Sequence, residues 1–200
     1  MVVDSITLTL PRWVVEFCES SGPIPSTDAA RMAFVIDLAR QNVERGSGGP
    51  FGAAIFNADT GALVSVGVNC VTASQCSIAH AEMFAIMLAQ RAAGTYDLGA
   101  AGQPRHELYT SGQTCAMCCG AVTWAGVRRV VSAASASDIE QIVGFDEGPH
   151  AVDWQAQLSR RGIEVMEGVL RHQARTVLEL YRALDGIVYN GRTAPSHSPK

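Results

Sequence analysis

The chain has few charged residues, and the basic ones are not in excess. Of its 200 residues, 17% are charged, and the formal net charge is −4. A protein that binds nucleic acid draws much of its affinity from basic side chains that neutralise phosphates. The shortage of basic residues therefore argues against nucleic acid as a partner.

Long apolar segments are also absent. The longest uncharged stretch, about 61–81, is interrupted by polar residues such as Asn69 and Gln75, so we expect no membrane span. The N-terminus lacks the basic and apolar regions of a secretory leader. Without export, the six cysteines are expected to be thiols or metal ligands, not disulfides. These absences predict a cytoplasmic protein with no membrane partner.

A phosphate-binding loop is missing as well, because no Gly-Lys-Ser/Thr follows the glycine-rich residues 46–52. What remains is an ordinary globular composition, 48% hydrophobic, with the length of one domain. The Ser-Gly-Pro-Ile-Pro linker at 21–25 ends an N-terminal arm (1–25) to which no chemistry is assigned. A core (26–168) and a C-terminal helix and tail (169–200) follow, with disorder expected over 193–200.

Hydrophobic periodicity predicts a succession of strands and helices. Ser26 or Thr27 is expected to cap the first helix. The predicted strands are 51–56, 63–70, 107–110, 128–133 and 163–166, and the predicted helices are 28–45, 79–93, 115–124, 138–142, 153–160 and 170–184. This order of elements indicates an α/β protein with a three-layer α/β/α fold.

Two short motifs carry the chemistry. His80-Ala81-Glu82 is followed, 35 residues after His80, by Cys115-Ala116-Met117-Cys118. One imidazole and two thiolates suit Zn²⁺, and three protein ligands leave the fourth position for water. The pattern therefore predicts a catalytic zinc site with His80, Cys115 and Cys118 as ligands and Glu82 as the proton shuttle.

Both motifs are predicted at helix starts, where unpaired N–H groups and the helix dipole lower the pKa of a thiol. Cys115 and Cys118 would lie about 60° apart on a helix, whereas His80 and Glu82 would lie about 200° apart. This spacing favours His80 on the metal and Glu82 off it. The alternative is a closed structural site with Cys119 as fourth ligand, which does not require a glutamate after the histidine.

The two motifs match the zinc deaminases, whose signature is His-x-Glu followed by Pro-Cys-x-x-Cys. Residues 26–190 resemble the cytidine deaminase-like superfamily and, within it, the bacterial guanine deaminases. The stretches that carry the resemblance are Gly49-Pro50-Phe51, Val68-Asn69, the two metal motifs, Gly-Phe-Asp-Glu-Gly-Pro at 144–149, and Tyr189-Asn190. The resemblance implies a mixed five-stranded sheet and hydrolysis of guanine to xanthine and ammonia by zinc hydroxide.

The resemblance also implies substrate contacts. Asn69 would hydrogen-bond the purine, Phe51 and Phe145 would stack on its two faces, and the backbone N–H of Ala81 would meet the ring carbonyl. Glu147 would bind the far edge of the base and take part in proton transfer. Each of the four side chains has a purely structural alternative, as a strand end, core aromatic or solvated acid.

A homodimer is the further implication. Its C-terminal helix would be exchanged between subunits, so that the tail with Tyr189 covers the neighbouring site. Packing without a lid function is the alternative for this tyrosine.

Two positions depart from the guanine deaminase pattern, because Gln113-Thr114 stand where Glu-Pro is usual. Thr114 is expected to cap the helix start in place of proline, and Gln113 removes a negative charge near the metal. The substrate therefore stays open between guanine and another amino-heterocycle, such as ammeline, cytosine, a nucleoside or a specialised-metabolite intermediate. A tRNA adenosine deaminase is disfavoured by the net charge, and a catalytically silent zinc-stabilised dimer by the intact Glu82.

Overall fold

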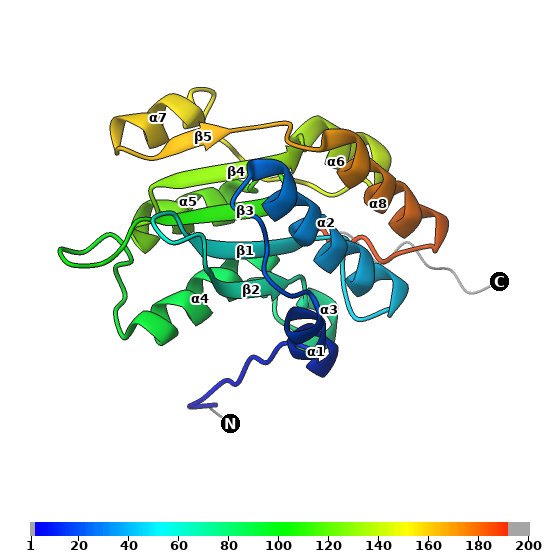
Figure 1. The fold of residues 1–200 in the computed structure, drawn as a ribbon. Helices are drawn as coiled ribbons and strands as arrows, with labels where there is room; N and C mark the ends of the chain where they lie inside the picture. Colours follow the sequence, from blue (N-terminus) through cyan, green and yellow to red (C-terminus); the bar gives the residue numbers. More distant parts are fainter. Residues whose placement is uncertain (1–2, 192–200) are drawn as a thin grey trace.

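A five-stranded sheet forms the middle layer of the computed structural model, which describes residues 3–191 (Figure 1). The strands are β1 (Gly52–Asn57), β2 (Leu63–Val68), β3 (His106–Gly112), β4 (Arg129–Ala134) and β5 (Glu164–Met166), in the spatial order β2-β1-β3-β4-β5. β1 pairs antiparallel with β2 and β3, whereas β3, β4 and β5 run parallel. The predicted mixed sheet is confirmed.

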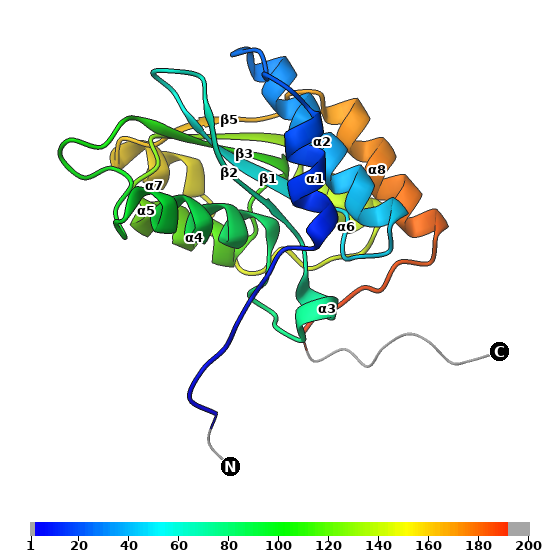
Figure 2. The same cartoon turned by 60° about the horizontal axis from the view of Figure 1, so that its bottom comes forward.

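Helices cover both faces of this sheet (Figure 2). α2 (Asp28–Glu44), α6 (Ala136–Ile142) and α8 (Arg171–Ala183) lie on one face, and α4 (Ala81–Ala93), α5 (Ala116–Ala125) and α7 (Trp154–Arg160) lie on the other. Successive strand side chains alternate between the layers. Tyr109 packs in the cluster that contains Met32 of α2, and its neighbour Leu108 packs in the cluster that contains Ala85 of α4. The α/β/α fold class is therefore confirmed.

Every predicted strand and helix is present, with ends displaced by at most two residues. Thr27 is the cap of α2, because its side chain accepts a hydrogen bond from the N–H of Ala30 at 3.2 Å. The predicted disorder at 193–200 lies outside the described residues. No helix within residues 3–191 has the length and hydropathy that a membrane span requires.

Two helices were missed by the sequence pattern, α1 (Arg12–Ser20) and α3 (Val71–Ser74). Pro11 immediately precedes α1, where its missing N–H costs little. Val14 is fully buried, and the ring of Phe17 stacks on Phe34 of α2 at 5.5 Å between centroids. The N-terminal arm therefore packs on the body of its own chain.

The start of α4 lies against β2 because position 67 is a glycine. A Cβ atom at Gly67 would lie 1.9 Å from the carbonyl oxygen of Ala81 and 2.8 Å from the backbone nitrogen of Ala85. No side chain fits in that space. The glycine thus allows the first turn of α4 to rest on the sheet, which fixes where His80 and Glu82 stand.

α8 packs against α2 and α6 of its own chain. Asp138 forms a capping box with Ser135 at the start of α6, and its carboxylate accepts two hydrogen bonds from Arg171, of 2.6 and 3.0 Å. It also pairs with Arg175. The bonds from Arg171 and from the other donors hold the pKa of Asp138 below its usual value. α8 is therefore held by charge-assisted contacts as well as by the apolar core.

A buried ion-pair network lies at the amino end of β3. Arg31 binds Glu107 at 2.7 Å, and Arg129 binds Asp28 through two hydrogen bonds of 2.7 and 2.9 Å. The hydroxyl of Tyr109 donates to Asp28 and lies within hydrogen-bond distance of both arginines. The bond from Arg129 lowers the pKa of Asp28 to about 2. We call these five residues the α2–β3 network; no sequence motif predicted it.

Candidate active site

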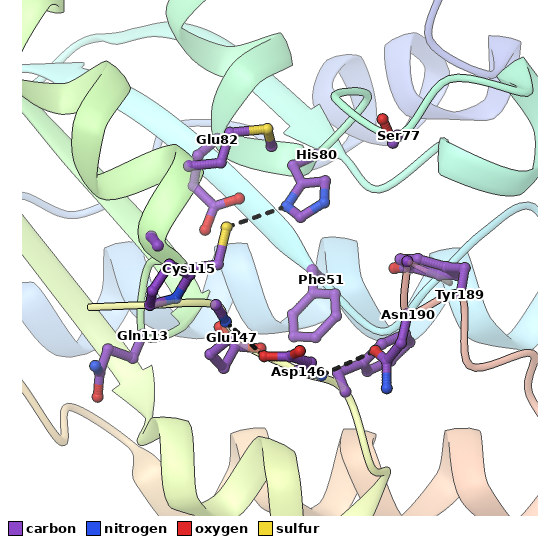
Figure 3. A pocket seen from close by; sticks show the side chains of 16 residues that line it. Phe51, Ser77, His80, Glu82, Gln113, Cys115, Asp146, Glu147, Tyr189 and Asn190 are labelled. Atoms are coloured by element: carbon purple, nitrogen blue, oxygen red, sulfur yellow. Dashed lines mark hydrogen bonds between the residues drawn. The ribbon is translucent and has the colours of Figure 1, made fainter. Parts of the chain in front are cut away.

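A cavity of about 340 Å³ opens at the carboxyl end of β3, beside the starts of α4 and α5 (Figure 3). Parallel strands in α/β proteins commonly present their ligands at this edge. The polar side chains that line the cavity come from four regions of the chain that are distant in sequence. They are Ser77, His80, Glu82, Gln113, Cys115, Asp146, Glu147, Tyr189 and Asn190.

Three potential metal ligands converge in this cavity. The Nδ1 atom of His80 lies 3.6 Å from the Sγ atom of Cys115 and 3.6 Å from that of Cys118. His80 is the N-cap of α4 and Cys115 is the N-cap of α5. Angles on a helical wheel therefore do not describe either pair, because only Glu82 and Cys118 are helical. His80 and Glu82 both line the cavity.

The three atoms fit a zinc ion. With Zn–N of about 2.05 Å and Zn–S of about 2.3 Å, a tetrahedral site separates nitrogen from sulfur by about 3.6 Å. Among residues 3–191, the group that could hold a metal consists of His80, Cys115 and Cys118, without Cys119. The closed alternative with four protein ligands is thus not supported.

The two thiols are electrostatically coupled. The hydrogen bond from Cys118 lowers the pKa of Cys115 to about 4, against the effect of burial. That bond, together with burial, raises the pKa of Cys118 well above its usual value. Cys115 is therefore the thiol of the pair that ionises more readily. A divalent cation would stabilise the second thiolate, because metal binding and thiol deprotonation are coupled.

Glu82 stands beside the ligands and is 6% exposed. The hydroxyl of Thr110 donates to its Oε1 at 3.1 Å, and the thiol of Cys118 lies 3.6 Å from its Oε2. Burial first, and the negative charge of Cys115 second, raise the pKa of Glu82. A carboxyl group with a raised pKa next to a metal site is suited to accepting and returning a proton.

Glu147 is the second buried acid of the cavity, and it is 7% exposed. Burial, reinforced by the charges of Cys115 and Glu82, raises its pKa to about 9. Its backbone carbonyl accepts a hydrogen bond from the N–H of Ala116 at 2.9 Å. The loop that carries Glu147 is therefore tied to the helix that carries the metal cysteines.

The aromatic residues form one cluster. The rings of Phe51 and Phe145 lie 5.5 Å apart at 59°, and the ring of Tyr189 lies 4.6 Å from that of Phe145. Two aromatic rings that hold a base between them must lie about 7 Å apart, twice the distance of van der Waals contact. In this conformation the two rings are too close for a base to lie between them, and their contact with the base stays a prediction.

Asn69 and Ala81 do not line the cavity. Asn69 is 1% exposed, and its Oδ1 accepts a hydrogen bond from the N–H of Val71 at 3.3 Å. Its Nδ2 and the hydroxyl of Tyr189 are both buried without a hydrogen-bond partner within residues 3–191. A Cβ atom at Gly49 would lie 2.4 Å from that hydroxyl and 3.1 Å from Asn69 Oδ1. Tyr189 therefore lies over Gly49 and next to Asn69. The substrate roles assigned from the resemblance stay predictions for all six residues, namely Phe51, Asn69, Ala81, Phe145, Glu147 and Tyr189.

The two departures near the metal have structural explanations. The N-cap of α5 is Cys115, and no side chain caps this helix. The expected capping role of Thr114 is therefore wrong. Thr114 precedes the N-cap residue by one position, and its side chain is buried. The Oε1 atom of Gln113 accepts a hydrogen bond from the N–H of Ala136 at 3.1 Å, at the start of α6.

Sequence reasoning assigned no role to three polar residues near the site, Thr110, Asp146 and Asn190, although the last two lie in stretches that carry the resemblance. Strand alternation places Thr110 on the same face as Leu108, but its bond to Glu82 depends on tertiary packing. Asp146 lines the cavity and accepts from the N–H of Gly148 at 2.8 Å.

The three-layer fold, the three-ligand cluster and the buried glutamate together define the class of zinc-dependent deaminases.

Comparison with known proteins agrees with this class. A family described as the cytidine and deoxycytidylate deaminase zinc-binding region matches residues 25–134. The chain belongs to this family and is an enzyme. It is 41% identical over 112 residues, 56% of this chain and 67% of the relative, to guanine deaminase of Bacillus subtilis (strain 168).

Two solved structures are similar over nearly the whole chain. One is guanine deaminase from Nitrosomonas europaea, with 43% identity and a TM-score of 0.85 over 92% of this chain and 99% of that one. The other is a variant protein in complex with 8-azaguanine, with 43% identity and a TM-score of 0.85 over 90% and 98%. The resemblance to the guanine deaminase branch is thereby confirmed.

Proposed function

We propose that this enzyme hydrolyses the exocyclic amino group of a free nucleobase, converting guanine and water to xanthine and ammonia. The observation that carries the proposal is Glu82, buried beside a three-ligand cluster in a cavity of about 340 Å³. Ligand cavities range from about 300 to 1,000 Å³, so this one suits a single small ring system. The guanine deaminases that resemble the chain support guanine as the base.

His80, Cys115 and Cys118 would hold the metal. When bound, Zn²⁺ supplies a Lewis acid that makes hydroxide available at neutral pH. Two thiolates and one neutral imidazole would bring the formal charge of the occupied site to zero, and they would leave one coordination position free of protein atoms.

Glu82 moves the protons in this proposal. It accepts one proton from water and gives it to a ring nitrogen. It then takes the second proton from the hydroxyl group added to the ring carbon and gives it to the amino group, which leaves as ammonia. Thr110 orients its carboxyl group through the 3.1 Å hydrogen bond. Glu147 binds the opposite edge of the base and takes part in proton transfer, and the rings of Phe51 and Phe145 contact its faces. Contact on both faces requires the two rings to separate.

Two further contacts are assigned to residues that do not line the cavity in this conformation. Asn69 donates its Nδ2, which has no partner in the described residues, to the purine. The backbone N–H of Ala81 meets the ring carbonyl, because the first N–H groups of a helix have no acceptor within the helix.

The test is Glu82→Gln, which keeps the size of the side chain. Ammonia release from guanine should fall by about 10²- to 10⁴-fold, while the zinc content stays at one ion per chain. Glu179→Gln on the exposed surface of α8 is the matched control and should keep full activity. Full turnover by the Glu82→Gln variant would refute the mechanism.

A second candidate keeps the reaction and changes the substrate to another amino-heterocycle, such as ammeline, cytosine, a nucleoside or an intermediate of specialised metabolism. Gln113 favours it, because this side chain lines the cavity as a neutral amide where guanine deaminases usually have an acid. A panel of aminopurines, aminopyrimidines and aminotriazines decides between the two. Ammonia from one of these compounds, with none from guanine, would establish the second candidate.

The enzyme is also proposed to be a homodimer that exchanges residues 169–200, although the described part of this segment packs on its own chain in this structure. Exposed apolar side chains at Leu184 and Ile187 (58% and 53%) flank the connection between α8 and the tail, which supports a moving hinge. Mixing Glu82→Gln with a chain truncated after residue 186 tests this. Exchange predicts that activity returns in refolded mixtures. In a mixed dimer the tail of the Glu82→Gln chain then covers the pocket of the truncated chain, which still has Glu82. Mixtures as inactive as their components would exclude exchange.

A further inference from the structure

The loop 144–149 carries Phe145 and Glu147 into the cavity, and both side chains are nearly buried at 5% and 7% exposure. The loop has no regular secondary structure. Gly144 and Gly148 have φ angles of +83° and +76°, a conformation that glycine adopts without strain. The position of the two buried side chains therefore depends on contacts between the loop and other parts of the chain, which include ring packing and hydrogen bonds.

One residue of the tail supplies two of those bonds. The Nδ2 atom of Asn190 donates to the carbonyl oxygen of Gly144 at 2.9 Å. Its Oδ1 accepts from the N–H of Asp146 at 2.9 Å (Figure 3). Across the part of the chain that the structure describes, no other side chain from outside the loop hydrogen-bonds to it. The two bonds bracket Phe145, and the second adjoins Glu147.

We propose that Asn190 is a positioning residue that clamps the 144–149 loop, so that Phe145 and Glu147 meet the base. The inference rests on the proposed function, since it concerns the substrate contacts of that site. A clamp from the tail couples the order of the loop to the seating of the tail, whose Tyr189 packs on Phe145 at 4.6 Å. A primary amide is the side chain that donates and accepts in one plane.

Three variants test the clamp. Asn190→Ala removes both bonds. Asn190→Asp keeps the shape and the acceptor but places a carboxylate against the Gly144 carbonyl. Asn57→Ala is the matched control, because the Oδ1 of Asn57 accepts from the N–H groups of Asp59 and Thr60 at 2.9 and 3.0 Å in a loop at the other end of β1.

The first measurement is hydrogen exchange, which needs no substrate. The amides of residues 145–148 should exchange about tenfold faster in both Asn190 variants than in the wild type and in Asn57→Ala. The second is steady-state kinetics of deamination. The KM should rise about tenfold with kcat within about threefold and an unchanged zinc content, because contacts to the base are loosened while the metal and Glu82 remain in place.

Several outcomes would overturn the clamp. They are unchanged exchange at 145–148 in Asn190→Ala, wild-type behaviour of the isosteric Asn190→Asp, and faster exchange without any change in KM. A wild-type enzyme that deaminates no base would instead refute the proposed function, and the exchange experiment would still decide whether Asn190 holds the loop.

Discussion

Two buried polar clusters stand at opposite ends of β3, and they differ in how completely they are paired. In the α2–β3 network each carboxylate has an arginine partner within 3 Å. In the cavity, Glu82 and Glu147 have no Lys or Arg partner among residues 3–191. The same strand contributes Glu107 to the first cluster and Thr110 to the second.

The pKa values follow this difference. Pairing lowers the pKa of Asp28 to about 2, whereas burial raises that of Glu147 to about 9. An unpaired buried acid costs free energy, and such groups gather at sites that bind or react. The paired network stabilises the fold, whereas the unpaired acids beside the metal ligands are suited to binding and reaction.

The largest expected effect comes from removing a metal ligand. Cys118→Ser should lose zinc and reduce deamination to the background rate, because one of two thiolates is gone, while the circular dichroism spectrum stays that of a folded protein. Ammonia release and metal analysis measure both quantities. Cys18→Ser is the control, because Cys18 is a half-buried residue of α1. This variant should keep both its zinc and its activity. Zinc retained at full occupancy with full activity would contradict the ligand assignment.

Breaking the α2–β3 network should affect stability instead of catalysis. Glu107→Ala leaves Arg31, whose side chain is 5% exposed, without its carboxylate, and should cost about 3–5 kcal/mol of unfolding free energy. Urea denaturation measures this cost, and kcat per folded molecule should not change. The control is Glu164→Ala, since Glu164 is 60% exposed in its pair with Arg129 and should cost under about 1 kcal/mol. Equal costs for the two variants would argue against a cooperative buried network.

The two clusters should give opposite pH dependences of stability. The folded pKa of Asp28 is lowered, so its contribution is present above the unfolded pKa of about 3.9 and is lost as pH falls towards 2. The folded pKa of Glu147 is raised, so its contribution is complete below about 4.3 and is lost as pH rises through about 9.

Unfolding free energies of the zinc-free protein between pH 2 and 9 measure both slopes. Asp28→Asn should flatten the acid side, and Glu147→Gln should flatten the alkaline side. Adding zinc should shrink the Glu147 effect, because a cation stabilises its charged form. An alkaline slope unchanged in Glu147→Gln would show that this acid is ionised throughout.

The contrast between the clusters also explains how much the sequence could predict. The sequence predicted the metal ligands and the neighbouring acid because their spacing along the chain forms a recognisable motif. These residues are His80, Glu82, Cys115 and Cys118. The strands and helices followed from hydrophobic periodicity, with ends within two residues. That small error still mattered, because His80 and Cys115 prove to be caps, so angles on a helical wheel do not describe them.

Contacts between distant segments were not predictable in this way. The pairing of Arg31 with Glu107 spans 76 residues, and that of Arg129 with Asp28 spans 101. No local pattern distinguishes these residues from solvated charges. For the same reason, the bonds of Asn190 to the 144–149 loop and of Thr110 to Glu82 required the structure.

The smallest expected effect concerns the hydroxyl of Tyr189, which is buried without a partner in the described residues. Tyr189→Phe removes a polar group whose burial is uncompensated, so the unfolding free energy should stay constant or rise by up to about 1 kcal/mol. If the hydroxyl and Asn69 hydrogen-bond the substrate, the affinity for 8-azaguanine should nevertheless fall by about threefold to tenfold. Calorimetric titration would measure this change. Phe145→Tyr at the adjacent ring adds a hydroxyl instead and serves as the comparison. A loss of stability in Tyr189→Phe would show that the hydroxyl is satisfied in the folded protein, and the division between a paired and an unpaired cluster would then fail at this residue.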